Sequence, residues 1–213
     1  MSPIASLLLP LWFACFVLQP GATISLKEVV IGDQIWMSVN LDTDTFSNGD
    51  HIPQVVNDYQ WIEANEKGEP AWCYYSGDDT DPKTYGKLYN WYAVNDPRGL
   101  APKGWRIPSD ADWLQLEQFC GGKKKAGLVL KSSSGWNKNG NGTQSNGFNA
   151  VPSGMRSKYG PCSDAGDIAY YWSSESYNEK QAFCRHLYYN NTMLGKDFMQ
   201  KGAGIAVHCV KNK

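Results

Sequence analysis

Frequent glycine and proline residues restrict this chain to folds that are rich in turns. Its 213 residues include 21 Gly and 11 Pro, too many for a bundle of long helices. Aromatic residues make up 13% of the chain and charged residues only 19%. Disordered chains show the opposite balance, so we expect this one to fold. The length favours one domain of about 190 residues behind a removable leader.

The charge balance argues against partners that are recognised through long-range electrostatics. Lys and Arg number 20, Asp and Glu number 21, and the formal net charge is -1. Nucleic-acid binding depends on a basic face, so we expect no nucleic-acid partner. The one basic cluster, at 123–125, is too small to hold the chain on a membrane surface by charge.

The first residues have the pattern of a secretory signal peptide. Residues 4–18 form an apolar run, and no charged side chain precedes Lys27. Such a run is too short to span a bilayer and fits the core of a leader. We predict a signal peptide over residues 1–22 and a single domain over residues 23–213. The protein would then be secreted or exposed at the cell surface.

Lipidation at Cys15 is a less favoured way of processing the leader. Ala14 suits a lipoprotein cleavage site, but Trp12 and Phe13 are bulky for one. A lipid anchor at Cys15 would be the only expected contact with a membrane.

The later cysteines indicate disulfides and not a metal site. They are Cys73, Cys120, Cys162, Cys184 and Cys209. No CxxC pair occurs, so neither a zinc site nor a thioredoxin-like site is predicted. In an exported chain we expect two disulfides and one remaining thiol. Spacing leaves the pairing open, although we expect Cys209 to be tied to an earlier element.

The predicted elements make an α+β fold with an antiparallel sheet. One helix is expected over 87–94, and a second begins with the capping box of Ser109 and Asp112 and ends at 121–122. Residues 54–70 and 131–147 are polar and are predicted to be irregular, the latter as a long surface loop. Strands are expected within 26–37, on both sides of a Gly-Asp turn, and at 72–75, 148–152, 170–174, 182–188 and 204–210.

A series of motifs resembles one protein family. The motifs are IGDQIWM at 31–37, YGKLYNWYAVN at 85–95, RGLAPKGW at 98–105, PSD at 108–110, GFNAVPSG at 147–154, YWSS at 171–174 and VHCV at 207–210. In this order they are similar to the Fibrobacter succinogenes major paralogous domain, which occurs in exported and lipid-anchored bacterial proteins. The resemblance covers residues 30–210.

The resemblance implies a fold and a general role. The family is distantly similar to C-type lectins and to sulfatase-modifying factors. It therefore implies a C-type-lectin-like fold with two helices, a twisted antiparallel sheet, terminal strands that come together and long irregular loops. Members are thought to display ligand-binding surfaces.

Two positions depart from the family's pattern. Many relatives carry Cys where this chain has Ala101, and that Cys is a plausible partner for the one matching Cys209. Its absence would allow Cys209 to pair with Cys120 or another thiol. His208 stands where Arg is more frequent, so a salt bridge made there would be weaker or dependent on pH.

Catalytic and metal-binding patterns are weak. No phosphate loop, GxGxxG or GxSxG motif occurs, and we expect no cofactor and no enzymatic activity. Cys184 and His186 lack the third group that a catalytic triad needs. We predict no metal site; the one weak candidate is a cluster of carboxylates that could bind a hard cation. Its residues are Asp78, Asp79 and Asp81.

Surface recognition is the function that these patterns favour. Tyr offers a large amphipathic contact area and Asn adaptable hydrogen bonds, as in antibody paratopes. The candidate residues are Tyr177, Asn178, Tyr188, Tyr189, Asn190 and Asn191. Strand alternation would half-bury one of the two adjacent tyrosines instead. The large Trp residues of the motifs are expected in the core; they are Trp36, Trp91, Trp105, Trp113 and Trp172.

The function predicted from the sequence is therefore an exported, non-enzymatic binding module for a glycan or a protein. The first alternative is a degenerate enzyme related to the formylglycine-generating group. The second is a structural component of a surface assembly, which a self-complementary edge strand would favour.

Overall fold

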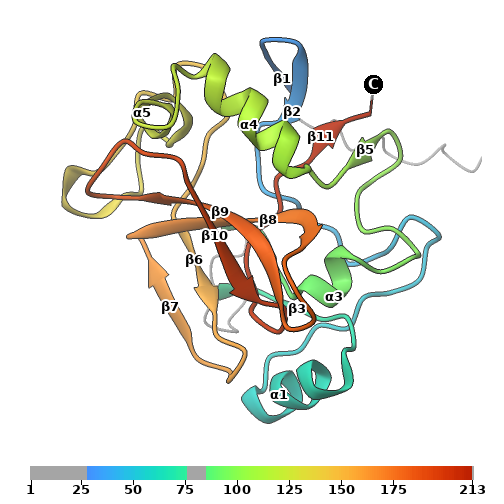
Figure 1. Ribbon diagram of the computed structural model, residues 1–213. Helices are drawn as coiled ribbons and strands as arrows, with labels where there is room; N and C mark the ends of the chain where they lie inside the picture. Colours follow the sequence, from blue (N-terminus) through green and yellow to red (C-terminus); the bar gives the residue numbers. More distant parts are fainter. Residues whose placement is uncertain (1–27, 76–84, 213) are drawn as a thin grey trace, which may run out of the picture.

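The computed structural model describes residues 28–75 and 85–212 (Figure 1), and the predicted signal peptide and the Asp78–Asp81 loop lie outside these ranges. Four α-helices, a short 3₁₀ helix and eleven strands are present in the described part. The fold is α+β, as predicted. None of the described helices is long and apolar enough to cross a membrane.

A four-stranded sheet brings the two ends of the described chain together. Its order is β1-β2-β11-β5, formed by Glu28–Ile31, Gln34–Met37, Val210–Lys211 and Trp105–Arg106. Val210 pairs with Trp36 of β2 on one side and Arg106 of β5 on the other. The predicted hairpin at the Gly-Asp turn and the pairing of the terminal strands are both confirmed. Gly32 supplies the positive φ of 59° that the turn requires.

The central sheet has five strands in the order β10-β9-β8-β6-β7. They are Gly195–Gln200, Gln181–Tyr188, Ile168–Ser176, Ser153–Arg156 and Cys162–Ala165. All neighbours are antiparallel except β6 and β8, so the sheet is mixed and not purely antiparallel.

The strand predictions at 148–152 and 204–210 were largely wrong. Only single bridges join Ala150 to Lys131 and Ala206 to Tyr171, and the regular strand β6 begins later, at Ser153. The alternation of apolar residues indicated that these segments are buried, and they are. Their backbones make only isolated bridges, each to a different element, and no continuous ladder.

The predicted helix over 87–94 is shorter than expected. Leu88–Tyr89 forms β4, which pairs with β3 at Trp72–Cys73, and only Trp91–Val94 is helical, as α3. Backbone hydrogen bonds in both directions between Tyr89 and Ile205 hold β4 extended. Asn90 then starts the helix by accepting a hydrogen bond from Ala93 N at 3.0 Å.

Helix α1, Asp58–Lys67, lies in a segment that was predicted to be irregular. Asn57 caps it by accepting hydrogen bonds from two backbone N–H groups, and Gly68 ends it with φ 68°. Its one large buried side chain, Trp61, donates to Gly202 O at 3.1 Å. Figure 1 shows α1 at the end of the molecule opposite α4 and α5.

Helix α4, Asp110–Phe119, confirms the capping-box prediction. Ser109 Oγ accepts from Asp112 N, and the Asp112 carboxylate accepts from Ser109 N at 2.8 Å. The short helix α5, Ala126–Leu130, follows it, and a 3₁₀ turn at Asn137–Asn139 is the only helix of the long loop.

Aromatic side chains form the core, in three clusters. Every Trp among the described residues is buried, including all five that were predicted to be. The first cluster lies around Trp72, Trp91 and Trp172, the second around Trp36, Trp113 and Phe148, and the third around Trp61 under α1.

The disulfide prediction is wrong for the described part of the chain, where no disulfide occurs. The buried thiols are spread over the three clusters: Cys73 lies in the third, Cys120 in the second, and both Cys184 and Cys209 in the first. Cys209 is tied to β2 by a backbone hydrogen bond from Met37 N to its carbonyl instead. Ala101, where many relatives carry Cys, packs against the same cluster as Cys209, so this chain lacks the disulfide that those relatives could form. Cys120 lies in another cluster and does not replace the missing Cys.

Candidate functional site

Two of the candidate residues, Tyr177 and Asn178, lie in the turn between β8 and β9. The Asn178 side-chain oxygen accepts hydrogen bonds from Lys180 N at 2.8 Å and Gln181 N at 2.9 Å. Its amide nitrogen donates to Gln181 Oε1 at 3.0 Å. Asn178 therefore shapes the turn, and Tyr177 provides the contact surface.

Tyr177 belongs to an exposed aromatic patch, which we define as Tyr177, Phe183 and Phe198. The rings of Tyr177 and Phe198 stack with centroids 4.6 Å apart and an interplanar angle of 5°. Phe183, opposite Phe198 in the β9–β10 ladder, meets Tyr177 edge-on at 5.3 Å. Tyr177 is 49% exposed and Phe198 is 44% exposed. Both side chains of the stack are therefore partly accessible to a ligand.

Two hollows adjoin this turn. The turn hollow, of about 310 Å³, is lined by residues 178–181 and Gln200. The α1 pocket, of about 300 Å³, lies between α1, α3, the turn at 158–159 and the turn at 179–180. Both contain Glu179, Lys180 and Gln200 in their walls. The two hollows therefore share part of their walls next to the turn that carries Tyr177, and we refer to them together as the depression.

The other candidates lie at the opposite end of β9: Tyr188 is its last residue, and Tyr189, Asn190 and Asn191 follow it. Strand β9 separates them from Tyr177 by eight residues, roughly 27 Å of extended chain. The structure therefore divides the six candidates into two groups and does not form one surface from them.

The carbonyl groups of this second group surround a buried lysine. Lys131 Nζ donates to the carbonyls of Gly140, Tyr188, Tyr189 and Asn191 at 2.6–3.4 Å. Lys131 is 3% exposed, and burial lowers the pKa of its ammonium. This arrangement fixes residues 188–191 against the long loop, which gives their backbone a structural role.

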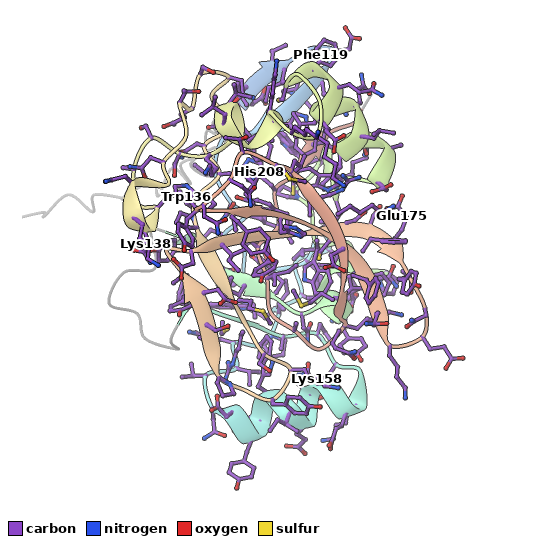
Figure 2. The ribbon with its side chains drawn as sticks, turned by 60° about the vertical axis from the view of Figure 1, so that its left-hand side comes forward. Phe119, Trp136, Lys138, Lys158, Glu175 and His208 are labelled. Atoms are coloured by element: carbon purple, nitrogen blue, oxygen red, sulfur yellow. The ribbon has the colours of Figure 1, made fainter. Side chains whose placement is uncertain are left out.

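Two side chains of the second group, those of Tyr188 and Tyr189, also contact other residues of the chain. Lys138 Nζ donates to Tyr189 Oη at 3.2 Å, and the Tyr188 ring lies 4.9 Å from that of His186. Tyr188 and Tyr189 are both half-buried, whereas one of them was expected to be. Figure 2 shows Lys138, beside Trp136, far from Lys158, which lies next to α1 in the α1 pocket.

Catalytic and metal chemistry find little support in the described residues. No group of three or more His, Cys, Asp or Glu side chains there could hold a metal ion, and the candidate Asp78, Asp79 and Asp81 lie outside the described ranges. Burial raises the pKa of Cys184 to about 12 and that of Cys209 further. Such thiols stay protonated at neutral pH and are poor nucleophiles.

His208 makes no salt bridge within the described part of the chain. Its Nε2 lies 2.6 Å from Met37 O and its Nδ1 lies 3.1 Å from Asn40 Oδ1, while the ring stacks on Phe148 at 4.0 Å. Complete burial lowers its pKa to about 4. His208 is therefore a neutral core residue above about pH 5.

Several residues of the site were not found from the sequence. Phe198 lies in β10, which was not predicted, and Tyr159 lies in the β6–β7 turn. Weak alternation at 196–200 was the only sign of β10. Nothing in the sequence indicated that Lys131 is buried, because a lysine within a Ser-, Asn- and Gly-rich loop is normally solvated.

Comparisons with known proteins place the chain in a family. No curated protein and no solved structure matches it. The sequence profile of the Fibrobacter succinogenes major domain matches residues 29–211, from the first strand to the last. This range exceeds half of the chain, and the chain therefore belongs to the Fibrobacter succinogenes major domain family.

Proposed function

We propose that this protein is an exported, non-enzymatic binding module with a C-type-lectin-like fold, which binds a glycan or a protein through the Tyr177 end of the central sheet. The exposed stack of Tyr177 on Phe198 carries this proposal. Exposed parallel rings beside a depression offer a rigid apolar surface with polar groups at its border, as ligand sites do.

The fold supports the likeness to C-type lectins in three respects. The terminal strands pair, the described part contains two ten-residue helices, and long irregular segments lie between them and the central sheet. The predicted leader over residues 1–22 supports export.

The enzyme alternative has little support. Cys184 and Cys209 are both buried, and no hydrogen bond joins Cys184 to His186 in the described structure. The assembly alternative would use an edge strand, yet the exposed edge strand β10 carries Lys196 and Asp197, charges that discourage edge-to-edge pairing.

Glycan and protein arrays probed with the mature domain would test the proposal. Tyr177→Ala is expected to weaken binding of any array ligand at least tenfold, because it removes half of the stack. Phe119→Ala is the matched control: Phe119 is 52% exposed and lies on α4, far from the α1 pocket (Figure 2).

Tyr188→Ala and Tyr189→Ala test the second group in the same arrays. If these two variants lose binding and Tyr177→Ala does not, the ligand surface lies at the other end of β9. If all three retain the binding of the parent domain, the proposed site is wrong.

A further inference from the structure

The α1 pocket has walls from segments that are distant in sequence but tied to one another. Asn65 of α1 donates to Lys158 O at 3.0 Å, and Trp61 donates to Gly202 O at 3.1 Å. Lys201 N donates to Lys180 O at 2.9 Å. A pocket with fixed walls binds a ligand without paying the entropy of ordering them.

At one wall of the pocket, Gly202 packs closely against α1. A side chain at Gly202 would place its Cβ 2.6 Å from Asn65 Cγ. Glycine lets the 200–202 turn approach α1 there, and the remaining space of about 300 Å³ is within the usual range of small-ligand sites.

The polar lining of the α1 pocket is balanced in charge. Glu66 and Glu179 supply two carboxylates, and Lys158 and Lys180 supply two ammonium groups. Gln200 adds an amide that donates and accepts. Within the described structure no hydrogen bond or ion pair occupies the side chains of Glu66, Glu179 or Gln200. These groups therefore keep their hydrogen-bonding capacity for a ligand.

The apolar part of the lining consists of Ile62 and two tyrosine rings, Tyr92 and Tyr159. Tyr159 is 66% exposed, with Lys158 Nζ 4.8 Å from its ring centroid. Flat rings beside balanced donors and acceptors complement a ligand that has apolar C–H faces and many hydroxyl groups but no net charge. A neutral saccharide has this chemistry, and a lining with two carboxylates and two ammonium groups offers an acidic glycan no net electrostatic attraction.

We infer that the α1 pocket binds a neutral sugar unit, and that the depression holds an oligosaccharide from Tyr159 to the Tyr177–Phe198 stack. The turn hollow, with Gln181 and Gln200, holds the sugars between these ends. This inference rests on the proposed function for the Tyr177 end and adds the class of ligand and a second aromatic contact.

Titration calorimetry with neutral hexasaccharides would test it. The probes are cello-, xylo-, manno- and maltohexaose and fully N-acetylated chitohexaose with their disaccharides, and an acidic hexagalacturonide for comparison. At least one neutral hexasaccharide is expected to bind more than tenfold tighter than its disaccharide and than the acidic probe. Tyr159→Ala and Gln200→Ala are each expected to weaken hexasaccharide binding about tenfold, and Phe119→Ala to leave it unchanged.

The outcomes separate this inference from the proposed function. If Tyr177→Ala abolishes hexasaccharide binding but Tyr159→Ala and Gln200→Ala have no effect, the pocket inference is overturned and the proposed function stands. The same holds if only acidic glycans or proteins bind through Tyr177. If neutral hexasaccharides bind and depend on Tyr159 but not on Tyr177, the pocket is supported and the proposed aromatic site is overturned.

Discussion

Raising the pH from 7 to 9.5 is expected to destabilise the protein by ionising thiols that the fold keeps protonated. Burial raises the pKa of Cys73 and Cys184 to about 12 and that of Cys120 to about 11, and it raises that of Cys209 further. Unfolded thiols ionise near pH 8.5. Because the folded-state pKa is the higher one, this stability is complete below about pH 8.5 and is lost as the pH rises toward the folded value.

The size of the effect follows from the separation of the two pKa values. At pH 9.5 ionisation stabilises each unfolded thiol by about 1.4 kcal/mol, while the folded thiol stays protonated. The four buried thiols together should lower the free energy of unfolding by about 6 kcal/mol, comparable with the whole stability of many domains. Urea unfolding followed by tryptophan fluorescence, with reductant at pH 7 and 9.5, measures this difference.

A variant with one thiol fewer gives the decisive comparison. In Cys184→Ala the loss between the two pH values should be smaller by about 1.4 kcal/mol. Each variant is compared with itself, so the cost of the cavity cancels. Val207→Ala, buried in the same cluster, leaves a cavity but no missing thiol and should show the full loss. An unchanged loss in Cys184→Ala would refute the reasoning, because Cys184 would then be exposed or oxidised.

Three further changes test the structure elsewhere. Lys131→Met should lower the unfolding free energy by about 3 kcal/mol, because four carbonyls lose their donor; exposed Lys124→Met should change it by less than about 0.5 kcal/mol in the same urea titration. Ser109→Ala should cost about 1 kcal/mol in thermal unfolding through loss of the capping box. Burial opposes ionisation of Asp112, but hydrogen bonds from Arg106 and Ser109 outweigh it and lower its pKa to about 2. About 2 kcal/mol should therefore be present above about pH 4 and lost toward pH 2, and Asp112→Asn should flatten this acid limb.

Local chemistry made some elements predictable. The Ser109–Asp112 capping box, the Gly-Asp hairpin and strands β8 and β9 each follow from residues close together in sequence. The buried positions of the large Trp residues followed in the same way, since each stands among apolar neighbours.

The missed elements depend on contacts that are distant in sequence. Helix α1 has only Trp61 and Ala64 buried, so its apolar face is too narrow to show as a periodic pattern. Arg156 of β6 fixes its start by donating to Val55 O, Val56 O and Asp58 Oδ1. The residues joined by these contacts are about 100 positions apart in the sequence, so no local pattern predicts them.

The candidate site was predictable only at Tyr177, whose place in a polar turn indicated exposure. Its stacking partner Phe198 depends on the pairing of β10 with β9, which places Phe198 opposite Phe183. Exposure of Tyr188 and Tyr189 was predicted by the same turn chemistry but is limited by Lys131 and Lys138. The sequence of residues 188–191 gives no sign that the buried Lys131 binds their carbonyl groups.

The position of Phe198 favours a binding role over a purely structural one. Phe198 is 44% exposed on an edge strand, where an apolar side chain adds little to stability and promotes association of unpaired edges. Its neighbours Lys196 and Asp197 are exposed charges that oppose such association while leaving the ring accessible. Lys196 also ion-pairs with Asp110 of α4 at 2.9 Å, and its Nζ lies 4.2 Å from the centroid of the Phe183 ring, so the patch is partly covered at Phe183. An aromatic surface that is both accessible and guarded against edge pairing suits a ligand that is neither a sheet nor another copy of the chain.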